Sequence, residues 1–281
     1  MAIEDVRPVA IGEWRGLSTA AGGTALSTAA AFVPFLPQMD WFTFSPWNFS
    51  TAVVAKIALN PWLAVVKTTD ALVTDALSVD NSVKMQDADT STTMSMNSFG
   101  AGTPNFVYVG SHIQFRGVVV TIGNTNSNAS TLAVKYWTGS AWATISPTDG
   151  TTSGGATLAQ TGNVTWTLPS DWAKASLNSV LNPANSGIGD TVLRAAIYMS
   201  PLYWTRWEVG SALDASVTVT GMLSMNRNTA NYPEWRPGER YEQTFYWGPG
   251  GLGCIEALTD AGTGSLIVTG AVTGAVGKSM A

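Results

Sequence analysis

Residues 131–142 have the sequence TLAVKYWTGSAW, in which Trp137 and Trp142 stand on either side of Thr138-Gly139-Ser140. From Thr131 to Trp137 the side chains alternate as they do in a half-buried β-strand. A short link that contains glycine, placed after such a segment, is typical of a β-hairpin. This stretch therefore predicts two antiparallel strands joined by a tight turn.

Strand-like alternation recurs through the middle of the chain. It is found at residues 106–109, 118–122 and 217–220, while residues 149–155 have the Gly, Ser and Thr content of a longer loop. Short strands at such spacing are typical of a sandwich or jelly roll. Only residues 171–177, with Ser170 or Asp171 as N-cap, and residues 51–59 have a helical pattern. The sequence thus predicts a mainly β protein with a central antiparallel β-sandwich that is jelly-roll-like.

Charged residues are scarce. They make up 12% of the 281 residues, about half of the roughly 25% that is usual in soluble domains. The hydrophobic content of 45% is ordinary and argues against global disorder, because disordered chains combine low hydrophobicity with high charge. The many residues of Gly (28) and Trp (12) favour strands joined by turns over helices.

Charge and cysteine content exclude several classes of protein. A net charge of −5 without any cluster of Lys and Arg argues against nucleic acid as a partner. The single cysteine, Cys254, excludes an intrachain disulfide and metal sites built from several thiolates. Residues 16–39 carry no charge, but they are mostly small residues interrupted by Pro34 and Pro37, so no membrane span is expected. The N-terminal residues lack the features of a signal peptide, so we expect synthesis in a cytoplasm without export.

The chain is expected to have three parts. Residues 1–100 form an N-terminal arm and small attachment domain, and residues 101–226 form the β-sandwich domain. Residues 227–281 form a Gly-rich C-terminal β extension. The arm and the extension are expected to gain order from contact with partners, because small residues and prolines do not build a core alone.

Four segments of the central part carry a resemblance to a known family. They are Tyr108-Val109-Gly110-Ser111 with Phe115-Arg116-Gly117, and then residues 134–142, 164–172 and 203–209. In order and sequence they resemble a β-sandwich module of virion proteins of tailed bacteriophages. The resemblance covers about residues 100–225, less than half of the chain, and residues 181–190 depart from it as an insertion before the last segment.

The resemblance implies a jelly-roll-like domain of the kind found in head decoration, head fibre, tail or adsorption proteins, and it implies no particular site or ligand. We therefore expect a non-enzymatic structural protein of the virion, attached to the capsid shell as a decoration or spike component. Expected partners are further copies of the chain, with a trimer favoured by the resemblance alone, and other virion proteins such as the major capsid protein. A tail or baseplate component and a carbohydrate-binding module that adsorbs to a host surface glycan are the alternatives, and a hydrolase is the weakest one.

Few residues are candidates for catalysis or metal binding. His112 has no second histidine and no cysteine near it, so a hydrogen-bonded loop histidine is expected rather than a catalytic or zinc-binding one. Asp80, Asp87 and Asp89 offer oxygen ligands but lack the spacing of a calcium loop. No catalytic, cofactor-binding or metal-binding residue is assigned, and no cofactor is expected.

Carboxylates for glycoside cleavage are nearly absent from the central part. Residues 90–170 contain one acid, Asp149, whereas such cleavage requires two. Glu208, Glu239 and Glu242 remain as nominal candidates. The alternation of Glu239 with Arg236 and Arg240 indicates an ion-paired turn instead.

The tryptophans have two interpretations. Exposed, they would form a platform on which a sugar ring stacks. Buried, they would fill the core between two sheets, and this interpretation is favoured for Trp137, Trp142, Trp166 and Trp204.

Arg206 lies in the segment Tyr203-Trp204-Thr205-Arg206-Trp207. Alternation places Trp204 and Arg206 on one face of the strand, and Thr205 and Trp207 on the other. The resemblance makes this arginine a regular feature of the strand. We therefore expect a structural role for it and no contact with a ligand.

Overall fold

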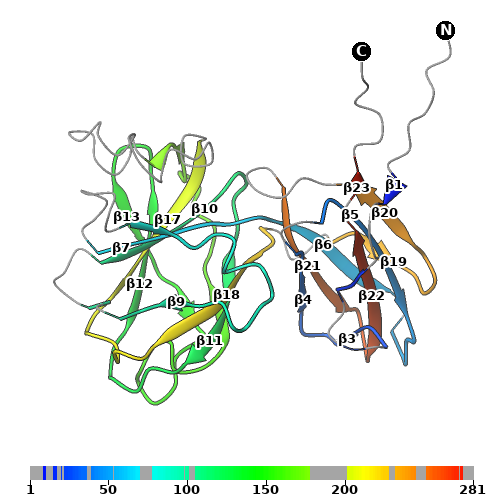
Figure 1. The fold of residues 1–281 in the computed structure, drawn as a ribbon, viewed down its shortest axis with the longest axis horizontal. Helices are drawn as coiled ribbons and strands as arrows, with labels where there is room; N and C mark the ends of the chain where they lie inside the picture. Colours follow the sequence, from blue (N-terminus) through cyan, green and yellow to red (C-terminus); the bar gives the residue numbers. More distant parts are fainter. Residues whose placement is uncertain are drawn as a thin grey trace, which may run out of the picture. The chain divides into compact units, whose positions relative to one another are not determined.

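The computed structural model describes residues 9–10, 15–17, 20, 22–36, 39–52, 54–69, 78–97, 99–100, 105–177, 201–227, 232–244, 251–271 and 273–274. The chain forms two compact units. Unit 1 contains residues 1–58, 232–247 and 255–281, and unit 2 contains residues 59–231 and 248–254. The elements of the described residues are strands, as the composition predicts (Figure 1).

Unit 2 is built from two sheets, whose strands are cyan, green and yellow in Figure 1. The first has the strand order β13-β12-β17-β10-β7-β8, with β16 paired to β17. Its strands are β7 (Ala64–Thr68), β8 (Ser78–Asp80), β10 (Phe106–Ser111), β12 (Leu132–Trp137), β13 (Trp142–Ile145), β16 (Lys174–Ala175) and β17 (Leu202–Val209). Every pair in this sheet is antiparallel.

The second sheet of unit 2 has the order β14-β15-β11-β18-β9 and is also antiparallel. Its strands are β9 (Met94–Ser95), β11 (Gly117–Asn124), β14 (Thr148–Asp149), β15 (Gly162–Thr165) and β18 (Thr218–Met225). The predicted strands at residues 106–109, 118–122, 131–137 and 217–220 are confirmed as β10, β11, β12 and β18, and the predicted hairpin is β12–β13.

The two sheets of unit 2 share one hydrophobic core. Val109, Val134 and Trp207 of the first sheet and Val118, Val164 and Met222 of the second belong to the same buried cluster. Because successive side chains of a strand point to opposite faces, one face of each sheet supplies this core. The arrangement is sandwich-like. The other face of the first sheet points away from this core.

Unit 1 also contains two sheets. One has the order β19-β6-β21-β4, from β4 (Ala31–Pro34), β6 (Ala55–Pro61), β19 (Glu234–Trp235) and β21 (Leu252–Thr259). The other has the order β2-β22-β5-β20 with β3 paired to β22, from β2 (Arg15–Gly16), β3 (Thr24–Leu26), β5 (Trp41–Trp47), β20 (Tyr241–Thr244) and β22 (Gly264–Ala271). A separate pair joins β1 (Val9–Ala10) to β23 (Thr273–Gly274). Strands β6 and β21 continue from unit 1 into unit 2.

Aromatic side chains hold the sheets of unit 1 together. The Phe44 ring of β5 lies 5.0 Å from the Tyr241 ring and 5.0 Å edge-on from the Trp235 ring of β19. The Phe42 ring lies 5.0 Å from the Phe35 ring at an interplanar angle of 50°. Phe35, Phe42 and Phe44 are among the most buried large side chains of the described residues. These contacts supply the core that the arm and the extension were each expected to lack.

Both predicted helices are wrong. Residues 55–61 are strand β6, and Lys174–Ala175 is strand β16, which pairs with Tyr203 and Leu202. Short apolar segments do not distinguish a helix from a buried strand by periodicity, so tertiary pairing determined both outcomes.

The two units differ from the predicted three-part division. Strand β22 from the Gly-rich extension pairs with β5 along seven residues, and its side chains Leu266 and Val268 are fully buried. The arm and the extension thus combine into one unit. At the other boundary, Leu63, Val65, Met94 and Phe99 of the predicted arm belong to the core of unit 2.

Candidate functional site

The candidate site is the face of the first sheet of unit 2 that points away from the core. Strand alternation places Val107, Val134 and Trp207 toward the core, so that their neighbours along β10, β12 and β17 lie on the opposite face. We call this surface the aromatic face, and it consists of Phe106, Tyr108, Lys135, Trp137, Trp142, Trp204, Arg206 and Glu208.

Strand register brings these side chains together. Arg206 of β17 is directly opposite Lys135 of β12 on one side and Tyr108 of β10 on the other. Trp137 is directly opposite Trp142 across the β12–β13 hairpin. Side chains directly opposite each other on one face of a sheet are in contact distance. The face therefore extends over four adjacent strands.

Arg206 is enclosed by aromatic rings and a carboxylate. Its guanidinium carbon lies 4.5 Å from the centre of the Phe106 ring and 5.3 Å from the centre of the Trp142 ring. Its Nη2 lies 2.6 Å from Oε1 of Glu208, and 18% of its side chain is exposed. Arginine is suited to this setting because its planar cation stacks on rings and bonds carboxylates at the same time.

Lys135 shares the same carboxylate. Its Nζ lies 3.1 Å from Oε1 of Glu208 and donates to Oε2 over 3.2 Å. Two cations thus share one anion, and the cluster carries a net charge of about +1 when all three groups are ionised. Among the described residues of this sheet, Asp80 of β8 also has its carboxylate on this side, three strands away from β17, and it accepts hydrogen bonds from the backbone and hydroxyl of Ser82.

The tryptophans of the hairpin are partly exposed. The rings of Trp137 and Trp142 are 5.5 Å apart at an interplanar angle of 63°. Trp142 also contacts the ring of Tyr108 at 5.8 Å, and Tyr108 itself is buried. Trp204 is fully buried, with its ring against Gly110 and its Nε1 donating to the carbonyl of Ala175. The rings of Tyr108 and Trp204 are therefore the buried part of the aromatic face, and Trp137 and Trp142 are its partly exposed part.

The four tryptophans that were predicted to fill the core between the sheets lie in three different environments. Trp166 lies between the sheets, in contact with Phe115 and Trp207, as predicted. Trp204 is buried, but on the face opposite to that core. For Trp137 and Trp142 the core assignment is wrong, because the hairpin register turns both away from Val134 and Ile145.

His112 is a loop residue just beyond β10. Burial lowers its pKa, and Lys174 lowers it further. Its Nδ1 is buried and has no hydrogen-bond partner, so the expected hydrogen bond is not found at that atom.

The candidate metal ligands are engaged in turns. Asp87 accepts from the backbone of Asp89 and the hydroxyl of Thr92, and Asp89 accepts from the backbone of Ser91. The Ser91 hydrogen bonds lower the pKa of Asp89. Among the described residues, no group of three or more His, Cys, Asp or Glu side chains is placed to hold a metal ion.

The remaining acids are also separated. Glu239 accepts a hydrogen bond from the backbone N–H of Arg236, and the ion pair at this turn joins Arg240 to Glu242 at 3.4 Å. Glu208 lies in unit 2, whereas these two acids lie in unit 1.

Sequence reasoning missed Glu256 in strand β21. This carboxylate is fully buried and accepts a hydrogen bond of 2.7 Å from the hydroxyl of Tyr232. The sequence signal that indicates its burial is its position between apolar residues in the segment that forms β21.

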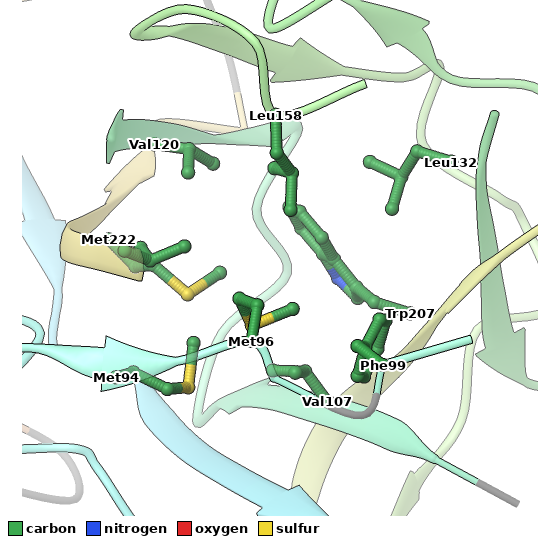
Figure 2. Close-up of a pocket in the computed structure, with 10 residues that line it drawn as sticks. Met94, Met96, Phe99, Val107, Val120, Leu132, Leu158, Trp207 and Met222 are labelled. Atoms are coloured by element: carbon green, nitrogen blue, oxygen red, sulfur yellow. The ribbon is translucent and has the colours of Figure 1, made fainter. Parts of the chain in front are cut away.

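The core of unit 2 contains a small void, shown in Figure 2. The indole of Trp207 lies there among Phe99, Met94, Met96 and Met222 (Figure 2). The space that a water-sized sphere can occupy is about 20 Å³, and its lining is apolar. A water needs polar partners, so this void is a dry packing defect and not a ligand site.

Comparisons with protein-family models, with curated proteins and with solved structures found no match for this chain. Within the part that the structure describes, no helix is long and apolar enough to span a membrane.

Proposed function

We propose that this protein is a non-enzymatic structural component of a tailed-phage virion, attached to the capsid shell as a head decoration or spike. The residue pattern of β10, β12 and β17 that resembles the phage module supports this proposal. Its partners in the particle are further copies of the chain and other virion proteins such as the major capsid protein.

The observation that carries the proposal is a group of four exposed loop stretches in unit 2 that carry no charge, whereas Lys84, Asp89, Asp171 and Lys174 are exposed elsewhere in the unit. Residues 123–125, 127–129, 152–155 and 210–212 are exposed almost throughout, and all of them are uncharged. Free-standing soluble domains have about 25–35% charged residues on the surface. A surface without charges is liable to associate, and this property suits a protein that is covered by neighbours in a particle.

The connections between the sheets support a jelly-roll-like domain. The chain changes sheet at seven connections, which are β8–β9, β9–β10, β10–β11, β11–β12, β13–β14, β15–β16 and β17–β18. Sandwiches of the Greek-key and jelly-roll classes are built by such crossings. We therefore propose the jelly-roll-like description for unit 2.

Imaging of labelled particles tests the proposal. Antibody or gold label directed at the full-length protein on intact virions is expected on the head shell. Label on the tail or baseplate would support the alternative placement. Purified particles that lack the protein would contradict a structural role in the virion.

A further inference from the structure

We propose that the aromatic face binds a saccharide that carries a carboxylate. The sugar ring stacks at the Trp137–Trp142 pair, and the carboxylate is held near Lys135. This inference goes beyond the structural role proposed above, and neither one depends on the other.

The two hairpin tryptophans supply the stacking surface. Their side chains are partly exposed, whereas those of Trp166 and Trp204 are buried. Pyranose rings have an apolar face that fits against an indole. A cross-strand tryptophan pair also stabilises a hairpin, but that role alone does not require charged groups beside it.

The charge of the face selects an acidic sugar over a neutral one. Lys135 and Arg206 are both paired with the single carboxylate of Glu208. The chain as a whole has a net charge of −5, so this locally positive group stands out against an acidic protein. A lysine ammonium has three donors. A ligand carboxylate near Nζ of Lys135 would neutralise the positive charge that Glu208 leaves uncompensated, and it would accept a charge-assisted hydrogen bond from the ammonium.

The site is held in place before a ligand arrives. Arg206 stacks between Phe106 and Trp142, and its bond to Glu208 places the carboxylate that Lys135 contacts. Arg206 is therefore a positioning residue, and the contacts with the ligand fall to Trp137, Trp142 and Lys135. Rigid strands position such groups more precisely than loops do.

An array of oligosaccharides tests the proposal on the full-length protein. The probes are oligosaccharides that contain uronate or sialate, each printed beside its carboxyl methyl ester, which has the same ring but no charge. We expect binding to at least one acid, and a preference of about threefold to fivefold over its ester, the range expected for one exposed ion pair. Trp137→Ala is expected to reduce binding of acid and ester alike by at least about fivefold. Lys135→Met is expected to abolish the preference and leave binding of the ester unchanged.

The matched control is Trp47→Ala, which removes an exposed tryptophan of unit 1 and is expected to leave binding unchanged. Thermal unfolding of each variant shows that the fold is retained. Absence of binding to every acidic probe, equal binding of acid and ester, or unchanged binding by a folded Trp137→Ala would each overturn the proposal. Loss of self-association in Trp137→Ala without any sugar binding would identify the face as a contact between copies and overturn it as well. None of these results bears on the location of the protein in the particle.

Discussion

At the scale of single residues, Arg206 combines two interactions that are usually separate. It lies on the face away from the core, and it is nevertheless largely buried by Phe106, Trp142 and Glu208. Its contribution to stability is therefore expected to exceed that of an exposed arginine in a surface ion pair.

We predict that Arg206→Ala lowers the free energy of unfolding by about 1–2 kcal/mol, through the loss of two ring contacts and of one of the two cations paired with Glu208. Arg206→Lys should lose most of the same stability, because an ammonium does not stack as a planar guanidinium does. Denaturant unfolding measures both variants. Arg240→Ala is the control, since its ion pair with Glu242 is exposed and should contribute less than about 0.5 kcal/mol. Equal stability of wild type and both Arg206 variants would show that the stacked geometry is not maintained in solution.

Residue 110 must be glycine because the ring of Trp204 in the neighbouring strand β17 fills the space that a side chain would occupy. A Cβ built on this residue would lie 2.6 Å from Cζ3 of Trp204, whose ring occupies the space above the glycine. We predict that Gly110→Ala lowers the free energy of unfolding by about 1–3 kcal/mol, the range for overpacking of a filled core. Gly22→Ala is the control, because nothing lies within 4 Å of a Cβ at that position. Similar melting temperatures for the two variants would contradict this packing of Trp204.

At the scale of elements, hydrogen bonds join the loop of residues 126–130 to the loop of residues 211–214 at one end of unit 2, and the carboxylate of Asp214 accepts two of them. Oδ2 of Asp214 accepts hydrogen bonds of 2.6 Å from both the backbone and the hydroxyl of Ser127. These bonds lower the pKa of Asp214 from its usual 3.8. A carboxyl with a lowered pKa in the folded state stabilises the fold above its unfolded pKa and loses that contribution as the pH falls through its folded pKa.

We predict that the loop of Ser127 becomes more mobile below about pH 4, and that Asp214→Asn does the same at neutral pH. Amide exchange of Ser127, followed by NMR as a function of pH, measures the change. In Asp214→Asn the exchange should no longer depend on pH beyond the intrinsic chemistry. A pH response equal to that of wild type would assign the effect to another group.

The strands that precede residue 101 determine which fragment folds. β7 pairs with β10 from Ala64 to Thr68, and β9 pairs with β18. A fragment of residues 101–226 would leave the edge of β10 unpaired and would lack Leu63, Val65, Met94, Met96 and Phe99 from the core. We predict that it aggregates or stays without fixed packing, whereas residues 59–231 fold. Near-ultraviolet circular dichroism of the two fragments separates these outcomes, and a folded fragment 101–226 would contradict the prediction.

The sequence predicted elements where a periodic signal was strong. The hairpin at Trp137 and Trp142 was correctly predicted, because alternation and turn residues agreed. The direction of the two tryptophans was not predictable, since a one-residue change of register exchanges the two faces of a strand. The burial of Glu256 and the central position of β22 in its sheet were not predicted either, because both depend on partners distant in sequence.

At the scale of the whole molecule, scarcity of charge should govern association. We predict that the purified full-length protein forms oligomers at micromolar concentration, because four exposed loop stretches of unit 2 (residues 123–125, 127–129, 152–155 and 210–212) lack the charges that keep copies apart. Analytical ultracentrifugation over a range of concentrations measures the oligomeric state. A single monomeric species throughout, together with the absence of the protein from particles, would contradict an assembled role.

Unit 1 has a consequence for how the chain acquires its structure during translation. Strand β5 ends at Trp47, but its partner β22 begins at Gly264, more than 200 residues later. At about 5–20 residues per second, the first strands leave the ribosome roughly 10–40 seconds before the strand that completes their sheet. Unit 2 lies mostly between them in the chain and is synthesised during that interval. We therefore expect the nascent protein to hold a folded unit 2 while strand β5 still has an open edge, because its partner β22 has not yet been synthesised.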